Sequence, residues 1–490
     1  MQDSKFLNLA RHFSANEWKQ FGLFLKSPYH NHSKQACQVY DYLQNCHPKF
    51  DQDRLNRKVV YKKLYGSKEI YKDGRIRDIF SKMNKLATSF LVVEQTKQNP
   101  FEEERLAMSA FNAHGLYEAA NKISDAQIKA LEAKQYKELK EYFYLQRLNH
   151  NRYFNPANTQ QGKDSLHLRH ALNYAEQFYC LSKLRYTSEY LARAFQLNEE
   201  QPLDQEDIQQ VLNDSEKFEA ENLLLKCYRQ LVLLFREPGR YSWQHYQNIK
   251  TTFFTHWKDL NELEVQVFYK HLYNYLVNMT RQDEALYEPE KLILYRFAID
   301  NELILYNSQL TYASFFNIAF IGSKVGEFAW TQDFIQEYQK YLPSEGKGNI
   351  LALANAILTF YQRDWGKTRE LIGPIYFREV SFELVRRSLL LRTFYEIFAE
   401  AGEGETSLSS HADTFLHFLS RKSNVKKSKA RPYKNLVCFT IRLSKLRVIA
   451  KPKAIQRLYR DVKNCDQLTF KPWILDHLKK INPEKQASRV

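Results

Sequence analysis

The apolar positions near the start of the chain recur at helical spacing. From Asp73 onward they stand three or four residues apart, as in a long amphipathic helix with one buried side. These positions are Ile76, Ile79, Phe80, Met83, Leu86, Phe90 and Leu91. Ser14 and Glu17 have the spacing of a capping box, which predicts that another helix begins there.

The polar segment SPYHNHS (27–33) breaks the helix that begins at the capping box with a proline and a turn. Further helices are predicted over residues 34–46 and 53–64. We therefore predict a small helical module over residues 1–98, which ends near Asn99 and Pro100.

Beyond this module the pattern becomes helix, short turn, helix. The 490 residues include only 14 glycines and 13 prolines, so helices meet few breaks. The 33 phenylalanines and 32 tyrosines can fill the gaps between neighbouring helices. The sequence therefore predicts an all-α fold.

One stretch carries a motif of paired helices. Phe315, Ile318 and Ala319 stand where a tetratricopeptide repeat has its W-x-x-L-G pattern, Gly326 and Phe328 form the predicted turn, and Pro343 ends the unit. This stretch resembles a tetratricopeptide repeat, although Gly322 occupies a position where that repeat usually has an aromatic residue.

Two further stretches are similar in part to the same repeat. In these stretches the matching positions are Phe111, Gly115, Tyr117 and Ala120, and then Ala356, Trp365 and Thr368. The resemblance implies that helix pairs stack into an irregular, curved α-solenoid over residues 99–420, because one pair cannot bury its own apolar face. It also implies a groove that binds a peptide or a partner protein.

A second resemblance concerns the segment EWKQFGLFLKSPYHN, which is similar to the opening of helical proteins from Bacteroidota without an assigned activity. It implies a bacterial cytoplasmic protein. The opening residues lack the apolar core of a signal peptide, and no run of apolar residues is long enough to span a bilayer, so we expect a cytoplasmic protein without a membrane span.

Charge is distributed unevenly along the chain, whose formal net charge is +16. Residues 1–100 carry 18 basic and 9 acidic side chains, whereas residues 101–420 carry 34 and 43. Residues 421–460 contain 14 lysines and arginines and no acidic residue. We expect residues 421–490 to form a third, basic helical segment.

Within this segment, the polar stretch 420–434 is predicted to be an exposed loop. A helix follows with Leu436, Phe439, Leu443, Leu446 and Ala450 on its apolar side, and a second helix has Ile455, Leu458 and Val462. The apolar sides are expected to dock on the preceding solenoid and leave the cations outside. The candidate contact residues are Lys426, Lys427, Lys429, Arg431, Lys434, Arg442, Lys445, Arg447, Lys451, Lys453, Arg457 and Arg460.

Three interpretations of these cations stay open. They can form a merely solvated surface, they can pair with the acidic middle of the same chain, or they can meet an external polyanion or acidic partner. The missing acidic residues argue against a merely solvated surface, since solvated helix surfaces normally mix both signs. Tyr433 and Tyr459 lie among the cations, where the bases of a single-stranded nucleic acid could stack.

Signatures of catalysis are missing from the sequence. The densest set of potential metal ligands comprises His30, His32, Cys37, Cys46 and His47, but their spacing does not suit a structural zinc site. His167 and His170 share a helical face and are more typical of packing or surface positions.

The glycines at 346, 348, 402 and 404 fit no phosphate-binding loop, and the six cysteines show no paired disulfide framework. We therefore expect no cofactor, no metal and no enzymatic activity. The favoured hypothesis is a protein-interaction scaffold with a cationic C-terminal contact surface, and the alternative is a protein that binds RNA or single strands through residues 421–460.

Overall fold

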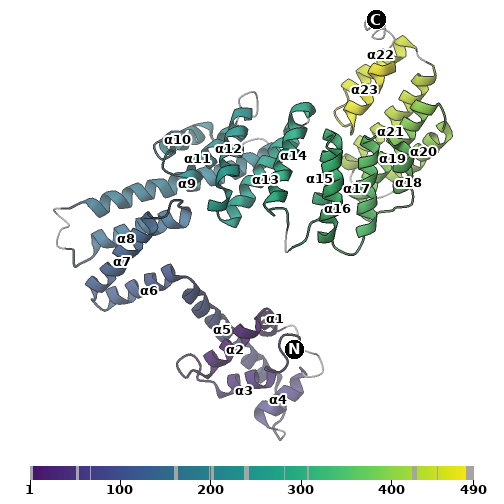
Figure 1. Cartoon of the computed structure of the whole chain (residues 1–490). Helices are drawn as coiled ribbons and strands as arrows, with labels where there is room; N and C mark the ends of the chain where they lie inside the picture. The colour runs from purple at the N-terminus through teal and green to yellow at the C-terminus, as the bar shows by residue number, and fades with distance from the viewer. Residues whose placement is uncertain are drawn as a thin grey trace. The chain divides into compact units, whose positions relative to one another are not determined.

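The computed structural model of the chain is all-helical in the part that it describes (Figure 1). The described residues are 4–50, 55–66, 68–158, 164–197, 199, 203–236, 242–280, 282–305, 308–421, 427–449 and 451–481. Within these ranges the chain forms 23 α-helices and no strand, so the all-α prediction is confirmed.

The chain divides into two compact units. The first comprises Met1–Leu184 and Gln209–Lys226, and the second comprises Arg185–Ile208 and Cys227–Val490. The helices through which the boundary passes are α9 (Leu166–Leu197), α10 (Gln205–Glu216) and α11 (Leu223–Arg236). The predicted three-part division at residues 98 and 420 stays a prediction.

The first unit begins with five helices around an aromatic core. They are α1 (Lys5–Ala10), α2 (Ala15–Lys26), α3 (Lys34–Leu43), α4 (Arg57–Tyr65) and α5 (Asp73–Gln98). The predicted capping box is confirmed, because Glu17 N–H donates to Ser14 Oγ at 3.1 Å and Ser14 N–H donates to the Glu17 carboxylate at 2.7 Å. The apolar stripe of α5 is buried as predicted except for Leu91, which is partly buried. Phe90 packs against Phe21 of α2 and against Phe13, which lies between α1 and α2.

The rest of the first unit includes three consecutive helices that share a small apolar core. They are α6 (Pro100–Ala113), α7 (Tyr117–Glu132) and α8 (Leu139–Phe154). Gly115 connects α6 and α7 with a positive φ of 72°, a conformation that favours glycine. Ala120 of α7 is buried in the small core that these helices share.

The second unit continues with α12 (Ser242–His256), α13 (Glu262–Met279) and α14 (Glu284–Asp300), followed by two helix pairs. The first pair is α15 (Tyr312–Val325) and α16 (Phe328–Tyr338), and the second is α17 (Lys347–Tyr361) and α18 (Trp365–Ile372). Such short connections place successive helices next to each other as antiparallel neighbours.

Gly326 ends α15 in the left-handed conformation, with φ 92°. Phe315, Ile318, Ala319 and Ala356 are fully buried in one core that both pairs share, and Phe328 and Trp365 pack against it. The residues with the repeat-like spacing therefore make the contacts between these helices.

Five helices complete the second unit. They are α19 (Val380–Ala401), α20 (Glu405–Arg421), α21 (Lys427–Val448), α22 (Pro452–Lys463) and α23 (Lys471–Ile481), and they share one apolar core (Figure 1). Among the described helices, none combines the length and the apolar character needed to cross a bilayer.

Candidate functional site

The helices α21 and α22 carry the predicted cationic residues, and their apolar sides fix how these residues are presented. Leu436 and Leu443 of α21 are fully buried, as are Leu458 and Val462 of α22. Ile455 is also buried, and Phe439 and Leu446 pack partly against the same core. The predicted docking of both helices by their apolar sides is confirmed, except that Ala450 lies outside the described residues.

The prediction of a loop over residues 420–434 is wrong for its described part, because α21 already begins at Lys427. Ala430 is buried and Tyr433 packs against Phe415 of α20, so the apolar stripe starts two turns earlier than the sequence pattern indicated. This burial stabilises the helix despite Pro432, which lies inside it and lacks an N–H donor.

The cations themselves point outward. Every candidate contact residue whose side chain is described is exposed; these are Lys429, Arg431, Lys434, Arg442, Lys445, Arg447, Lys451, Lys453, Arg457 and Arg460. Lys426 lies outside the described residues, and Lys427 is described only as the first residue of α21. We call the ten exposed residues the cationic surface.

Very little of this surface is neutralised by the chain. Among the described residues, its single ion pair joins Arg442 Nη2 to Asp461 at 2.7 Å, and both side chains are more than 40% exposed. Arg447 donates to the backbone carbonyl of Ala399 and so ties α21 to α19 without losing its charge. An exposed pair contributes little to stability, about 0–1 kcal/mol.

The two tyrosines among the cations differ. Tyr433 packs against the core, and burial raises the pKa of its phenol, so its ring is not a surface for stacking bases. Tyr459 of α22 is exposed and lies between Arg457 and Arg460 in the sequence. Only one of the two proposed stacking positions is therefore accessible.

A buried polar cluster anchors α23 against α19 and thereby supports the cationic surface. Glu396 accepts hydrogen bonds from Trp473 Nε1 at 2.6 Å and from His477 Nε2 at 2.9 Å. Burial alone would raise the pKa of Glu396, but the bonds from His477 and Trp473 lower it below the usual value. One turn earlier, the guanidinium of Arg392 lies 3.7 Å from the ring centroid of Phe470.

The other residues that could carry chemistry have packing roles. His30 stacks on Phe24 and His47 stacks on Trp18, while the Cys37 thiol donates to the Leu25 carbonyl at 3.2 Å. In the described ranges, no three His, Cys, Asp or Glu residues come together as a metal site.

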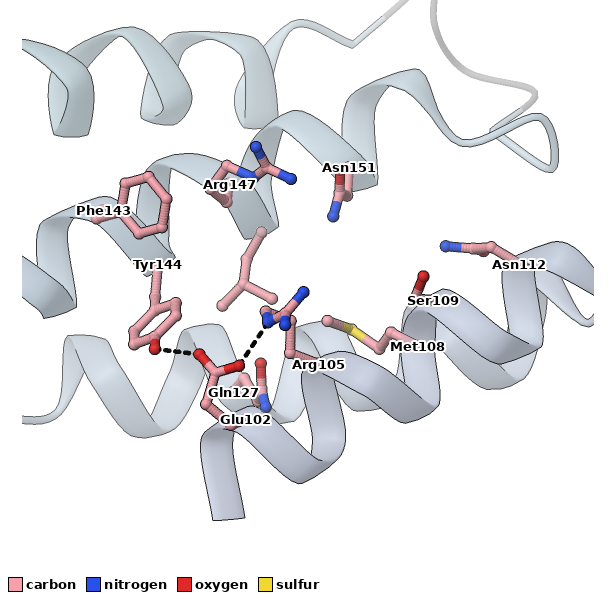
Figure 2. A pocket seen from close by; sticks show the side chains of 11 residues that line it. Glu102, Arg105, Met108, Ser109, Asn112, Gln127, Phe143, Tyr144, Arg147 and Asn151 are labelled. Atoms are coloured by element: carbon pink, nitrogen blue, oxygen red, sulfur yellow. Dashed lines mark hydrogen bonds and ion pairs between the residues drawn. The ribbon is translucent and has the colours of Figure 1, made fainter. Parts of the chain in front are cut away.

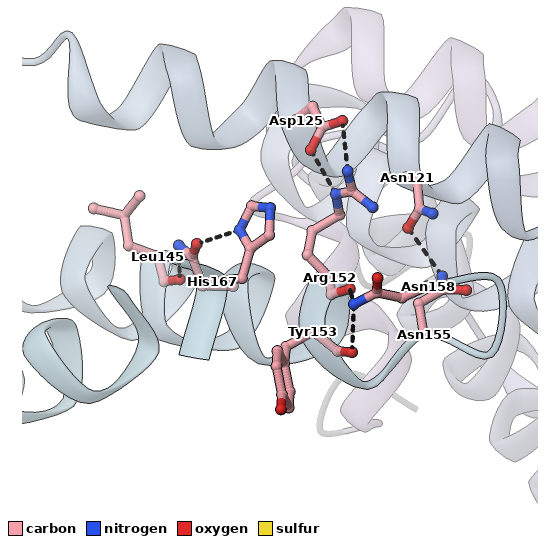
Figure 3. A network of polar contacts seen from close by, with 9 residues as sticks. Asn121, Asp125, Leu145, Arg152, Tyr153, Asn155, Asn158 and His167 are labelled. Carbon is pink, nitrogen blue, oxygen red and sulfur yellow. Dashed lines mark hydrogen bonds and ion pairs between the residues drawn. The ribbon is translucent and has the colours of Figure 1, made fainter. Parts of the chain in front are cut away.

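His167 belongs to a polar network in the first unit (Figure 3). Its Nδ1 lies 2.8 Å from Asn149 Oδ1, and burial lowers the pKa of the ring. Beside it, Arg152 of α8 holds Asp125 of α7 by two hydrogen bonds of 2.6 and 3.2 Å. These hydrogen bonds connect α7, α8 and α9, so His167 has a structural role.

A pocket of about 520 Å³ lies in the first unit, and no pattern in the sequence indicated it. It is lined by α6, α7 and α8, and each of the three helices contributes polar side chains (Figure 2). The lining residues are too far apart in the sequence, and too ordinary in type, to form a motif.

Comparison with known proteins gives no match: no family model, no curated protein and no solved structure is significantly similar to this chain.

Proposed function

We propose that this protein is a non-enzymatic interaction scaffold built on stacked helix pairs, and that its cationic surface binds a polyanionic or acidic partner. The proposal rests on one observation: the ten cations of this surface are exposed, and among the described residues they form a single, exposed ion pair. Like charges at neighbouring helix positions repel, so this arrangement costs stability unless anions approach from outside.

The scaffold part of the proposal rests on the helix pairs α15–α16 and α17–α18. Gly326 in its left-handed conformation, Phe315 and Ala319 in the core, and Trp365 at the start of α18 support the resemblance to tetratricopeptide repeats. We infer that residues 99–420 form an irregular solenoid of such pairs, which offers its surface to a peptide or protein. Internal neutralisation by the acidic middle segment is less supported, because the described cations form no ion pair with it.

A second candidate function is the binding of RNA or single-stranded DNA at the same surface. It is favoured by the exposed Tyr459 between two arginines, since bases can stack on an aromatic ring while cations hold the phosphates. The burial of Tyr433 makes this candidate weaker than an acidic protein partner.

The test compares two fluorescent probes of similar charge, an oligoglutamate of about 20 residues and an oligouridine of about 20 nucleotides, in a salt series. The full-length chain is titrated against each probe by fluorescence anisotropy. The variant replaces Lys445, Lys453, Arg457 and Arg460 by glutamine; the control variant replaces Lys122, Lys129, Lys340 and Lys367, which are exposed residues of other helices.

The surface variant is expected to weaken binding and to flatten the dependence on salt, whereas the control variant keeps the affinity of the wild-type chain. For a single strand, loss of four phosphate contacts reduces the slope of log K against log salt by about 3. Preference for the glutamate probe supports an acidic protein partner, and preference for uridine supports the second candidate. If neither probe binds, or if both variants behave alike, the cationic surface is not a contact surface.

A further inference from the structure

The pocket of the first unit combines cationic and amide side chains from α6 and α8 (Figure 2). The third lining helix, α7, adds Gln127, whose amide nitrogen donates to Glu104 at 2.7 Å. Arg105 and Asn112 come from α6, whereas Arg147 and Asn151 come from α8. In Figure 2 both guanidinium groups and the amide nitrogens of both asparagines point toward the space between the helices, and Ser109 points in from α6. The two guanidinium groups and the two amide nitrogens therefore offer several hydrogen-bond donors to a ligand in this pocket.

One of the two arginines is held in place before any ligand arrives. Arg105 Nε donates to Glu102 Oε2 at 2.8 Å, and the other oxygen of Glu102 accepts a hydrogen bond from Tyr144. These bonds lower the pKa of Glu102, first through Tyr144 and then through Arg105, so the carboxylate stays charged. Because this bond uses only Nε, the outer nitrogens of the guanidinium keep their N–H donors for a ligand.

The other arginine has no such partner. Arg147 is exposed and makes no ion pair with any described residue. A guanidinium matches the planar, two-oxygen geometry of a carboxylate and is weakly hydrated, which makes it well suited to anion binding.

The net charge of the pocket distinguishes between anions. Two arginines and Glu102 give the lining residues a formal charge of +1, which balances one carboxylate and leaves a doubly charged phosphate uncompensated. Phe143 is 44% exposed at the wall of the pocket, and Met108 and Leu148 form apolar parts of its lining. An apolar group next to the carboxylate would cover the exposed ring of Phe143.

We propose that this pocket binds an organic carboxylate, with Arg105 and Arg147 on its oxygens and Phe143 against its apolar body. The carboxylate can belong to a small acid or to the C-terminus of a peptide. The site shares no residue with the cationic surface, so failure of one proposal leaves the other intact.

The four methionines of the chain allow a direct test, because Met108 lines the pocket whereas Met83 and Met279 are buried elsewhere. The full-length protein is labelled with ¹³C at the methionine methyl groups, and Met108→Leu assigns the reporter signal. The probes are N-acetylphenylalanine, its amide, a short peptide with a free C-terminal phenylalanine, and inorganic phosphate, each at constant ionic strength. They are added up to about 20 mM, well above the roughly 1 mM dissociation constant of a fragment-sized ligand.

The free carboxylates are expected to shift the Met108 signal in a saturable way, while the signals of Met83 and Met279 stay in place. Arg147→Gln is expected to weaken this binding about tenfold or more, and Asn151→Asp, which adds a negative charge, to abolish it. Arg169→Gln, at an exposed arginine outside the pocket, is the matched control and should bind like the wild-type chain.

Tighter binding of the peptide than of N-acetylphenylalanine indicates a peptide terminus, and equal binding indicates a small acid. The proposal is overturned if Met108 does not respond to the carboxylates, if the amide or phosphate binds as well as they do, or if Arg147→Gln binds as tightly as Arg169→Gln.

Discussion

Replacing Gly322 by alanine is expected to destabilise the pair of helices α15 and α16. A β-carbon at this position would lie 2.3 Å from Thr331 Oγ1 and 3.2 Å from the nearest atom of the Trp330 ring. Thr331 is fully buried, and its hydroxyl donates to the Glu327 carbonyl at 2.7 Å, so it cannot rotate away without loss. The helices approach closely here because the side chain is missing.

The size of the effect follows from two opposing contributions. Overpacking at a rigid, buried contact costs up to about 3 kcal/mol. Alanine also favours the helix over glycine by about 1 kcal/mol. The net loss in local stability is therefore about 2 kcal/mol, which corresponds to about 30-fold faster exchange of the amide hydrogens in α15 and α16.

Hydrogen exchange read by mass spectrometry measures this loss in peptides that cover residues 312–338. Gly348→Ala is the matched control, because a β-carbon there meets no atom within 4 Å and should slightly slow the exchange of α17. The double variant Gly322→Ala with Thr331→Ala removes the clashing oxygen and should recover part of the lost protection. Unchanged or slower exchange in Gly322→Ala would refute the close approach of these helices.

Two further predictions concern buried polar groups of the second unit. Burial lowers the pKa of His411 from 6.5 to about 4. As the pH falls, the unfolded chain therefore takes up the proton before the folded chain does. The stability of α20 should decline by about 2 kcal/mol between pH 7 and pH 5. Hydrogen exchange of α20 measures this decline, which His411→Gln should abolish; an equal decline in that variant would contradict the assignment. Glu396→Gln weakens the hydrogen bonds from Trp473 and His477 and should destabilise the docking of α23 by about 2 kcal/mol. The control, Asp476→Asn on the exposed side of α23, should leave this docking unchanged. Equal protection of residues 471–481 in both variants would show that Glu396 does not anchor the helix.

The cationic surface could be predicted in outline from the sequence. The spacing of Ile455, Leu458 and Val462 fixed the buried side of α22. Because residues 421–460 contain no acidic residue, the cationic surface has only the ion pair between Arg442 and Asp461 among the described residues. The start of α21 could not be predicted, because Pro432 and the repulsion between the like charges of the preceding lysines oppose a helix there. Contact of Tyr433 with Phe415, which comes from another helix, outweighs both effects.

The pocket could be predicted from the sequence even less than the start of α21. Arg105 and Asn112 stand seven residues apart in α6, and Arg147 and Asn151 stand four apart in α8, which is ordinary helical spacing. Nothing in that spacing indicates that the two faces meet or that Glu102 orients Arg105. The sequence by itself determined the helices, their buried sides and the uneven charge, since these follow from periodicity and composition. Only the tertiary structure decided which polar side chains converge, because that depends on how helices distant in the sequence pack against each other.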